Sequence, residues 1–381
     1  FGKNRFLCYH DNTIFHPNAM LSYHIVLGDV CSGRNNHFNL IRFVAAYAVL
    51  VSHAWPISRG VGTDEPLTSL IGYSLGEIAV IIFFSLSGFL ITKSFEQRAS
   101  IRSFLIARFA RLFPGLAVSL VLVGFIIGPL TSELGMWNYL QDRETATFFL
   151  RNLTLIQPQF TLPGVFEDLP YPAIEGSIWT LAHEAACYGL VLVLGVAGAF
   201  RKRITLSIML TFYALSWIFL PVIEVYVHSK LLQTYALALP FLVGTAFWLW
   251  RNVIFLSLPI AVLFWSAFVL GNGTTLAYPA LVLALTYTLF WLAHLPEKFL
   301  LNFNSSGDYS YGIYVYAFPI QGLVIWLWGP MPPTINIAYA APVTLICAIL
   351  SWHYVEKPAL LFARACKGSQ ALNGLHYRSN P

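Results

Sequence analysis

The stretch Asn39-Leu-Ile-Arg-Phe-Val-Ala-Ala-Tyr-Ala-Val-Leu-Val-Ser-His-Ala-Trp55 decides the fold, because it is apolar enough for a membrane helix and still carries two ionisable side chains. Arg42 and His53 are separated by a step of eleven residues, which on an α-helix returns to the same face within about 20°, three turns and about 16 Å away. That rise is roughly half the thickness of a bilayer core. Because ionisable residues inside the membrane are costly, the pair predicts a functional site for a long ligand that lies along this helix.

The amino-acid composition identifies a membrane protein. Of the 381 residues, 57% are hydrophobic and 10% are charged, and the mean hydropathy is +0.66. Soluble domains carry about 25% charged residues, so a soluble protein is excluded. Aromatic residues reach 16%, as expected where Trp and Tyr gather at the membrane interfaces. We therefore expect an all-α polytopic membrane protein, whose net charge of +5 sets its orientation and indicates no nucleic-acid partner.

Apolar segments of membrane-spanning length predict about 10 transmembrane helices in one membrane domain. They lie at roughly residues 38–56, 75–94, 109–130, 177–199, 204–223, 232–250, 253–271, 276–294, 310–329 and 337–355. The predicted division is a polar, irregular N-terminal segment without a secretory signal (1–37), a membrane domain (38–360) and a polar, weakly basic tail (361–381).

The distribution of basic residues predicts the orientation. Ten spans place both termini on one side, and 18 of the 22 Lys and Arg residues fall on that side. The positive-inside rule therefore puts both termini in the cytoplasm and the long 131–176 loop outside. None of the five cysteines has the spacing of a metal site, and three lie in segments assigned to the cytoplasm, where thiols stay reduced. We expect neither a disulfide nor a metal site.

His53 and Glu184 are the candidate catalytic residues. His53 lies about three residues from the outer end of its predicted span, and Glu184 lies about eight residues into the span that Gly176 opens. At 1.5 Å per residue the two have similar depths, so we expect them to meet. A neutral imidazole is a general base towards a hydroxyl, and a carboxylate can orient it. The alternatives are an interfacial histidine and a polar pair that packs helices, and His183, on another face, is the weaker candidate.

Three arginines form a candidate anion site at the inner surface. Arg42 begins the first span, while Arg108 and Arg111 are three residues apart and share one face at the start of the third. Guanidinium groups bind phosphates with paired hydrogen bonds, which suits a phosphate-bearing cofactor. The alternatives are snorkelling anchors, positive-inside charge and binding of anionic lipids.

Two stretches near the C-terminus carry weaker signals. Tyr311 and Tyr314 recur along the start of the ninth span and are expected to line a polar path, with an interfacial aromatic belt as the alternative. Glu356 and Lys357 close the tenth span, and we interpret them as an interfacial stop signal.

Five short motifs, in order, resemble the membrane acyltransferase-3 family, the O-acyltransferases that modify bacterial surface polysaccharides. They are Arg42-x10-His53, Phe84-Ser-Leu-Ser-Gly-Phe-Leu-Ile91, Arg108-x-x-Arg111 followed by Pro114, Ser177-Ile-Trp-Thr-Leu-x-x-Glu184 and Ser351-x-x-x-x-Glu-x-Pro358. Each motif is short, but five in order over residues 38 to 360 make a specific match. Within them, Ser87 and Trp179 are expected to contact substrate together with Tyr311 and Tyr314.

The chain departs from the family pattern at three points. Ala317 stands where many members have a histidine, so a role of that histidine is absent here. Ile81 stands near a position that is acidic in many members. This sequence also lacks the esterase-like domain that some members append, so we expect acceptor delivery to rely on the membrane domain and the 131–176 loop.

The resemblance implies transfer of an acyl group, most often acetyl, from cytoplasmic acetyl-CoA to a hydroxyl of a cell-surface glycan. Arg42, Arg108 and Arg111 would hold the coenzyme phosphates, and the pantetheine arm would run along the first span to His53. There, His53 with Glu184 would deprotonate the sugar hydroxyl for direct attack on the thioester, with a transient acetyl-His53 as the alternative. The implied location is the bacterial inner membrane, in contact with its lipids.

The competing function is that of a polytopic transporter or a lipid- or glycan-binding membrane protein. Transporters commonly contain inverted repeats with paired broken helices, and this sequence has no such symmetry. The sequence leaves open the glycan, which is lipopolysaccharide, exopolysaccharide or a lipid-linked precursor. It also leaves open the length of the acyl group and the oligomeric state.

Overall fold

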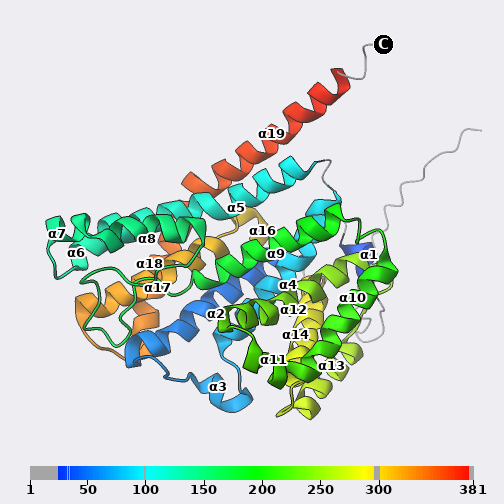
Figure 1. The fold of residues 1–381 in the computed structure, drawn as a ribbon, viewed down its shortest axis with the longest axis horizontal. Helices are drawn as coiled ribbons and strands as arrows, with labels where there is room; N and C mark the ends of the chain where they lie inside the picture. The colour runs from blue at the N-terminus through cyan, green and yellow to red at the C-terminus, as the bar shows by residue number, and fades with distance from the viewer. Residues whose placement is uncertain (1–24, 32, 34, 98–99, 296–300, 377–381) are drawn as a thin grey trace, which may run out of the picture.

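The computed structural model describes residues 25–376 except 32, 34, 98–99 and 296–300, and in this part the chain is a helical bundle with one pair of two-residue strands (Figure 1). The elements are β1 (Ile25–Val26), α1 (Leu27–Val30), α2 (Phe38–Arg59), α3 (Pro66–Ile71), α4 (Leu75–Glu96), α5 (Ile101–Leu122), the π-turn η2 (Val123–Ile127), α6 (Gly128–Thr131), α7 (Met136–Gln141), α8 (Arg143–Thr154), α9 (Trp179–Val196), α10 (Arg203–Ser216), η3 (Trp217–Phe219), α11 (Leu220–Tyr226), α12 (Ser229–Leu249), β2 (Phe255–Leu256), α13 (Leu258–Gly271), α14 (Ala277–Ala293), α16 (Phe303–Ser306), α17 (Ser310–Trp328), α18 (Pro333–Ser351), the π-turn η4 (Trp352–Glu356) and α19 (Lys357–His376).

The all-α expectation is confirmed, and each predicted span coincides with a helix. In the described residues, 8 helical segments are long and apolar enough to cross a membrane, and α13 and α14 are apolar but shorter. The chain is therefore a multi-pass membrane protein. The count of ten spans and the cytoplasmic location of the termini stay predictions.

Three predicted boundaries are wrong. The third span's helix begins at Ile101 rather than 109, which places Arg108 about two turns and Arg111 nearly three turns inside it. The last helix continues through η4 into α19, so that much of the predicted tail is helical. Helix α19 runs beside α5 and projects from the bundle (Figure 1). Residues 25–30 are not irregular, because β1 pairs with β2 and Leu27 is fully buried. The rest of the predicted N-terminal segment up to residue 24 lies outside the described residues.

The predicted 131–176 loop is partly helical and is folded back onto the bundle. It contains α7 and α8, and the Tyr139 hydroxyl donates a 2.7 Å hydrogen bond to the carbonyl of Gly124 in η2. That carbonyl lies in a π-turn, where the regular helical hydrogen-bond pattern shifts and leaves acceptors free. The contact ties α7 to η2, and the remainder of the loop, 155–178, reaches the end of α2, where the carbonyl oxygen of Pro170 lies beside Gly60.

Helix α2, which carries Arg42 and His53, lies against α4, α17 and α18. Polar side chains form hydrogen bonds between these helices. Such bonds are important in a membrane, because the hydrophobic effect does not drive helices together in lipid. The Gln321 amide of α17 donates to the carbonyl of Leu50 at 2.9 Å, and Asn336 of α18 donates to the carbonyl of Gln321 at 3.0 Å. These hydrogen bonds fix the rotation of α2 about its own axis, and with it the direction of the face that bears Arg42 and His53.

Helices α4 and α12 cross in backbone contact at two glycines. A β-carbon on Gly88 would collide with the carbonyl oxygen of Phe241, and one on Gly244 would collide with that of Ser85. Small residues let membrane helices approach to backbone contact, where Thr92 and Thr245 also share a 3.1 Å hydrogen bond. The motif glycine of the second span therefore has a packing role.

Replacing Gly88 or Gly244 by Ala should lower the apparent melting temperature in detergent, because the added methyl meets backbone that cannot move aside. Overpacking of this kind costs about 1–3 kcal/mol. The control is Gly189→Ala in α9, where nothing lies within 4 Å of the added carbon. A loss equal to that of the control would contradict the crossing geometry.

Candidate functional site

Four adjoining cavities lie within the bundle, and we call them the basic, narrow, lateral and loop cavities. The basic and narrow cavities meet at the arginines of α2 and α5. The basic cavity is lined by residues that include Arg42, Arg108, Arg111, Asp308 and Arg364. The narrow cavity shares Arg42 and Arg111 with the basic cavity and adds Ser87, Glu184, Tyr188, Tyr311 and Tyr314. These two arginines therefore stand at the junction between the two cavities.

The other two cavities meet at His53. The lateral cavity shares Val80 and Tyr314 with the narrow cavity and adds His53 and Trp179. The loop cavity shares His53 and Trp179 with the lateral cavity and is bounded by the 155–178 loop, including Glu175. Each cavity thus shares wall residues with the next, from the arginines at one end to the imidazole and the loop at the other.

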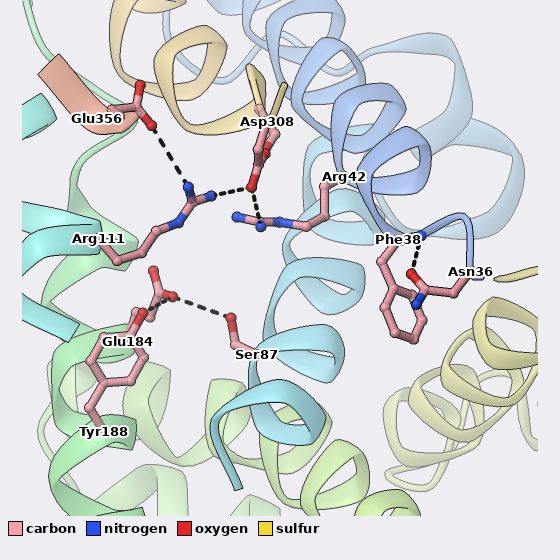
Figure 2. Close-up of polar contacts among 10 residues, drawn as sticks. Asn36, Phe38, Arg42, Ser87, Arg111, Glu184, Tyr188, Asp308 and Glu356 are labelled. Carbon is pink, nitrogen blue, oxygen red and sulfur yellow. Dashed lines mark hydrogen bonds and ion pairs between the residues drawn. The ribbon is translucent and has the colours of Figure 1, made fainter. Parts of the chain in front are cut away.

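A single carboxylate holds the two junction arginines. One oxygen of Asp308, directly before α17, accepts hydrogen bonds from Arg42 at 2.6 Å and from Arg111 at 2.7 Å, and Arg111 also lies 3.8 Å from Glu356 (Figure 2). Burial raises the pKa of Asp308, but the charges of Arg111 and Arg42 outweigh it and lower the pKa to about 2. Asp308 is therefore ionised at any physiological pH.

Glu356 belongs to this cluster and not to the membrane surface. Its side chain is 1% exposed and accepts a 3.0 Å hydrogen bond from Ser351, one residue before the π-turn η4. The interpretation of Glu356 as an interfacial stop signal is therefore wrong. The Ser351 and Glu356 positions of the closing motif act together to present a carboxylate to Arg111.

Arg108 differs from the other two arginines because no ion pair to it is found in the described chain. Its guanidinium lies 5.8 Å from the ring centroids of Phe104 and Tyr188, and its Nε is buried without a hydrogen-bond partner. Of the four cavities, Arg108 lines only the basic cavity. Arg108 is thus the cation of the cluster that is available to an anion in that cavity.

Glu184 lies beside the arginines and does not meet His53, which corrects the predicted pair. It accepts hydrogen bonds from Ser87 and from the Tyr188 hydroxyl (Figure 2). Helix α4 gives the depth of each group. Gly76 of α4 lies beside Ser52, the neighbour of His53, since a β-carbon on Gly76 would lie 2.9 Å from Oγ of Ser52. Ser87, which binds Glu184, comes eleven residues later in the same helix. Eleven residues amount to about 16 Å, so Glu184 is at the depth of Arg42 rather than that of His53.

His53 faces the loop end of the cavity series. Its ring lies edge-on to Phe318, with centroids 5.3 Å apart, and its Nδ1 is buried without a hydrogen-bond partner. His183 also lines the loop cavity, but its Nδ1 is engaged with the Thr234 hydroxyl at 2.8 Å. Of the two histidines that line the loop cavity, His53 is therefore the one with a buried, unpaired ring nitrogen.

The remaining predicted residues line the cavities in two groups. Ser87, Tyr311 and Tyr314 line the narrow cavity, and Trp179 lines the lateral and loop cavities. Tyr311 donates to the carbonyl of Leu112 and Tyr314 to that of Ser177, so both tyrosines are buried wall residues and not an interfacial belt. Their hydroxyls tie α17 to α5 and to the segment before α9.

Sequence reasoning missed Asp308, Glu175 and the role of Glu356. Asp308 stands two residues before the predicted ninth span, and its position at a helix start beside a basic surface was the available signal. Glu175 stands directly before the motif of the fourth span, within a loop whose burial the sequence does not reveal. Both carboxyls are buried, and a buried carboxyl near arginines or a histidine is a functional candidate.

Comparisons with known proteins agree on one family. Residues 35–352 match the family described as acyltransferase domain. The chain is 31% identical over 337 residues to an O-acetyl transferase of Shigella phage Sf6, covering 85% of this chain and 96% of that protein. It is 27% identical over 371 residues to nodulation protein 10 of Rhizobium leguminosarum bv. viciae, covering 86% and 94%. No solved structure matches the chain.

Replacing Asp308 by Asn should lower the apparent melting temperature in detergent, because two partly buried guanidinium groups lose their shared counter-charge. A hydrogen bond to a charged group contributes about 1.5–3 kcal/mol. The control is Asp29→Asn, which removes an exposed carboxyl of α1. Equal melting of the Asp308 and Asp29 variants would show that the bridge contributes nothing to stability.

Proposed function

The chain belongs to the acyltransferase-3 family and is a membrane O-acyltransferase, and from this premise we propose that it transfers an acetyl group from cytoplasmic acetyl-CoA to a hydroxyl of a cell-surface or lipid-linked glycan. The observation that carries the proposal is the series of cavities that adjoin one another from Arg108 to His53. The acetyl donor is supported by the O-acetyl transferase relative, and the bacterial inner membrane is the location that fits a cytoplasmic donor and an outer acceptor.

The basic cavity suits the phosphates of coenzyme A. Arg108 has a buried Nε without a partner, so an anion placed there would satisfy a group that now lacks a hydrogen bond. Arg364 of α19 lines the same cavity from the opposite helix and adds a second cation. Arg42 and Arg111 already share the single negative charge of Asp308, and we assign them to the junction that the coenzyme arm must pass.

The narrow cavity suits the uncharged arm of the coenzyme. Its walls combine Phe83, Phe84 and Leu112 with the hydroxyls of Ser87 and Tyr311, which fits a chain of methylene and amide groups. The rise from Arg42 to His53 is about 16 Å, comparable with the length of the pantetheine arm. The thioester would therefore reach His53 while the nucleotide stays at the arginines.

At His53 the chemistry is a direct acyl transfer. The neutral imidazole takes the proton of the acceptor hydroxyl, and the hydroxyl oxygen forms a bond to the thioester carbonyl carbon. The carbon–sulfur bond then breaks, and the imidazolium returns the proton to the departing thiolate. His53 thus ends the cycle in its starting form, and coenzyme A leaves as the free thiol.

The loop cavity suits a sugar acceptor. Its walls include the aromatic rings of Phe160, Tyr171 and Trp179 and the polar side chains of Gln157 and Gln233. Aromatic faces against the apolar side of a sugar ring, with amides for its hydroxyls, are the usual means of glycan recognition by a concave site. The 155–178 loop that closes this cavity is therefore the proposed acceptor entrance.

Replacing Arg108 by Gln should raise the KM for acetyl-CoA about 10- to 100-fold, because a charge-assisted hydrogen bond to phosphate contributes about 1.5–3 kcal/mol. The apparent melting temperature should hardly change, since no ion pair is lost. Steady-state transfer to a surface-glycan fraction measures both points. The control is Arg102→Gln, an exposed arginine of the same helix, and an unchanged KM in the Arg108 variant would remove it from the donor site.

Replacing His53 by Ala should reduce transfer by at least about 100-fold, because general-base catalysis contributes 10²–10⁴-fold. Binding of acetyl-CoA should persist, since the phosphates are held three turns away. Radiolabelled acetyl transfer and equilibrium binding of the donor measure the two effects. The control is His353→Ala, an exposed histidine of η4.

Two results would contradict the assignment of His53. Full activity of the Ala variant would exclude it from the mechanism. Loss of donor binding together with activity would place the imidazole in the donor site instead of at the point of transfer.

A further inference from the structure

Glu175 is a buried carboxyl without a partner. The residue is 0% exposed, and neither carboxyl oxygen has a hydrogen-bond partner in the described chain. Its backbone N–H donates to the carbonyl of Phe160 at 3.1 Å, which holds this part of the loop in place. Burial raises the pKa of Glu175 well above its ordinary value. Because an unpaired buried carboxyl is destabilising, its presence here calls for an explanation other than folding.

The loop that carries Glu175 is pressed against the aromatic ring that touches His53. A β-carbon on Gly176 would collide with the ring of Phe318, and that ring lies edge-on to His53, 5.3 Å away. Both Glu175 and His53 line the loop cavity. Glu175, Phe318 and His53 therefore all line that cavity.

The two unsatisfied groups are chemically complementary. Nδ1 of His53 is a buried nitrogen without a partner, and in the tautomer that leaves Nε2 free as a base it carries a proton to donate. Glu175 is the one carboxyl among the described residues that line the loop cavity. Glu77, which lines the lateral cavity, already accepts from the backbone N–H and the hydroxyl of Ser74 in a helix cap.

We propose, on the basis of the proposed acyl transfer, that Glu175 is the positioning residue of His53. Its carboxylate accepts a hydrogen bond from Nδ1–H of the imidazole, directly or through one water molecule, and so holds Nε2 towards the acceptor hydroxyl. When Nε2 takes the hydroxyl proton, Glu175 stays ionised and balances the imidazolium until that proton passes to the thiolate. The same hydrogen bond stabilises the carboxylate, so pairing offsets the effect of burial.

Two substitutions of Glu175 test the proposal together. Glu175→Gln keeps the shape and removes the charge, and Glu175→Met replaces the unpaired carboxyl by an apolar chain of similar length. For both we expect kcat to fall at least about tenfold with the KM for acetyl-CoA unchanged. The apparent melting temperature without substrate should stay the same for Gln and rise for Met, since the unsatisfied buried group is gone.

A purely structural role predicts the opposite sign in melting. Lower melting of both variants in parallel with lost activity would therefore overturn the proposal, as would an unchanged kcat. A raised KM for the acceptor at unchanged kcat would also overturn it, because Glu175 would then contact substrate. The control is Glu167→Gln in the same loop, whose carboxylate accepts from the backbone N–H of Gly164. Wild-type enzyme without acetyl transfer would refute the proposed function itself, a result separate from these.

Discussion

The Asp308 carboxylate between Arg42 and Arg111 is the interaction on which the arrangement of the site depends. Two guanidinium groups that approach one another in a membrane protein repel, and one ionised oxygen shared between them turns that repulsion into a bridge. The bridge joins α2, α5 and the start of α17, and Glu356 extends it to the π-turn after α18. Helices far apart in the sequence are thereby held at one depth.

This bridge separates the arginines by role. Arg42 and Arg111 are ion-paired through Asp308 and line both the basic and the narrow cavity, while Arg108, whose guanidinium lies 5.8 Å from two ring centroids, has no ion pair in the described chain. A site with three unpaired arginines would bind anions strongly but would be costly to bury without a ligand. With two of them paired, the empty site can be stable and still offer one cation to a phosphate.

At the other end of α2 the polar groups are left unsatisfied. Nδ1 of His53 and both oxygens of Glu175 are buried without partners, in a cavity bounded by the 155–178 loop, within which the N–H of Glu175 donates to the carbonyl of Phe160. Groups of this kind lower stability and are typical of sites that hold strain for a reaction. The contrast between an arginine end that is largely ion-paired and a His53 end without ion pairs among the described residues agrees with binding at the first and chemistry at the second.

Sequence reasoning reached the helices and the stripe from Arg42 to His53, because hydrophobic length and the spacing of residues on one helix are local properties. It placed Glu184 beside His53 and missed Asp308 and Glu175, because the depth of a side chain depends on where a neighbouring helix begins and how the helices pack. Glu184 of α9 meets Ser87 of α4, eleven residues beyond the Gly76 that lies beside Ser52, because α9 begins at Trp179 and packs against α4 at that level. Which charges meet was therefore decided by packing between helices, a non-local property that spacing along the chain does not contain.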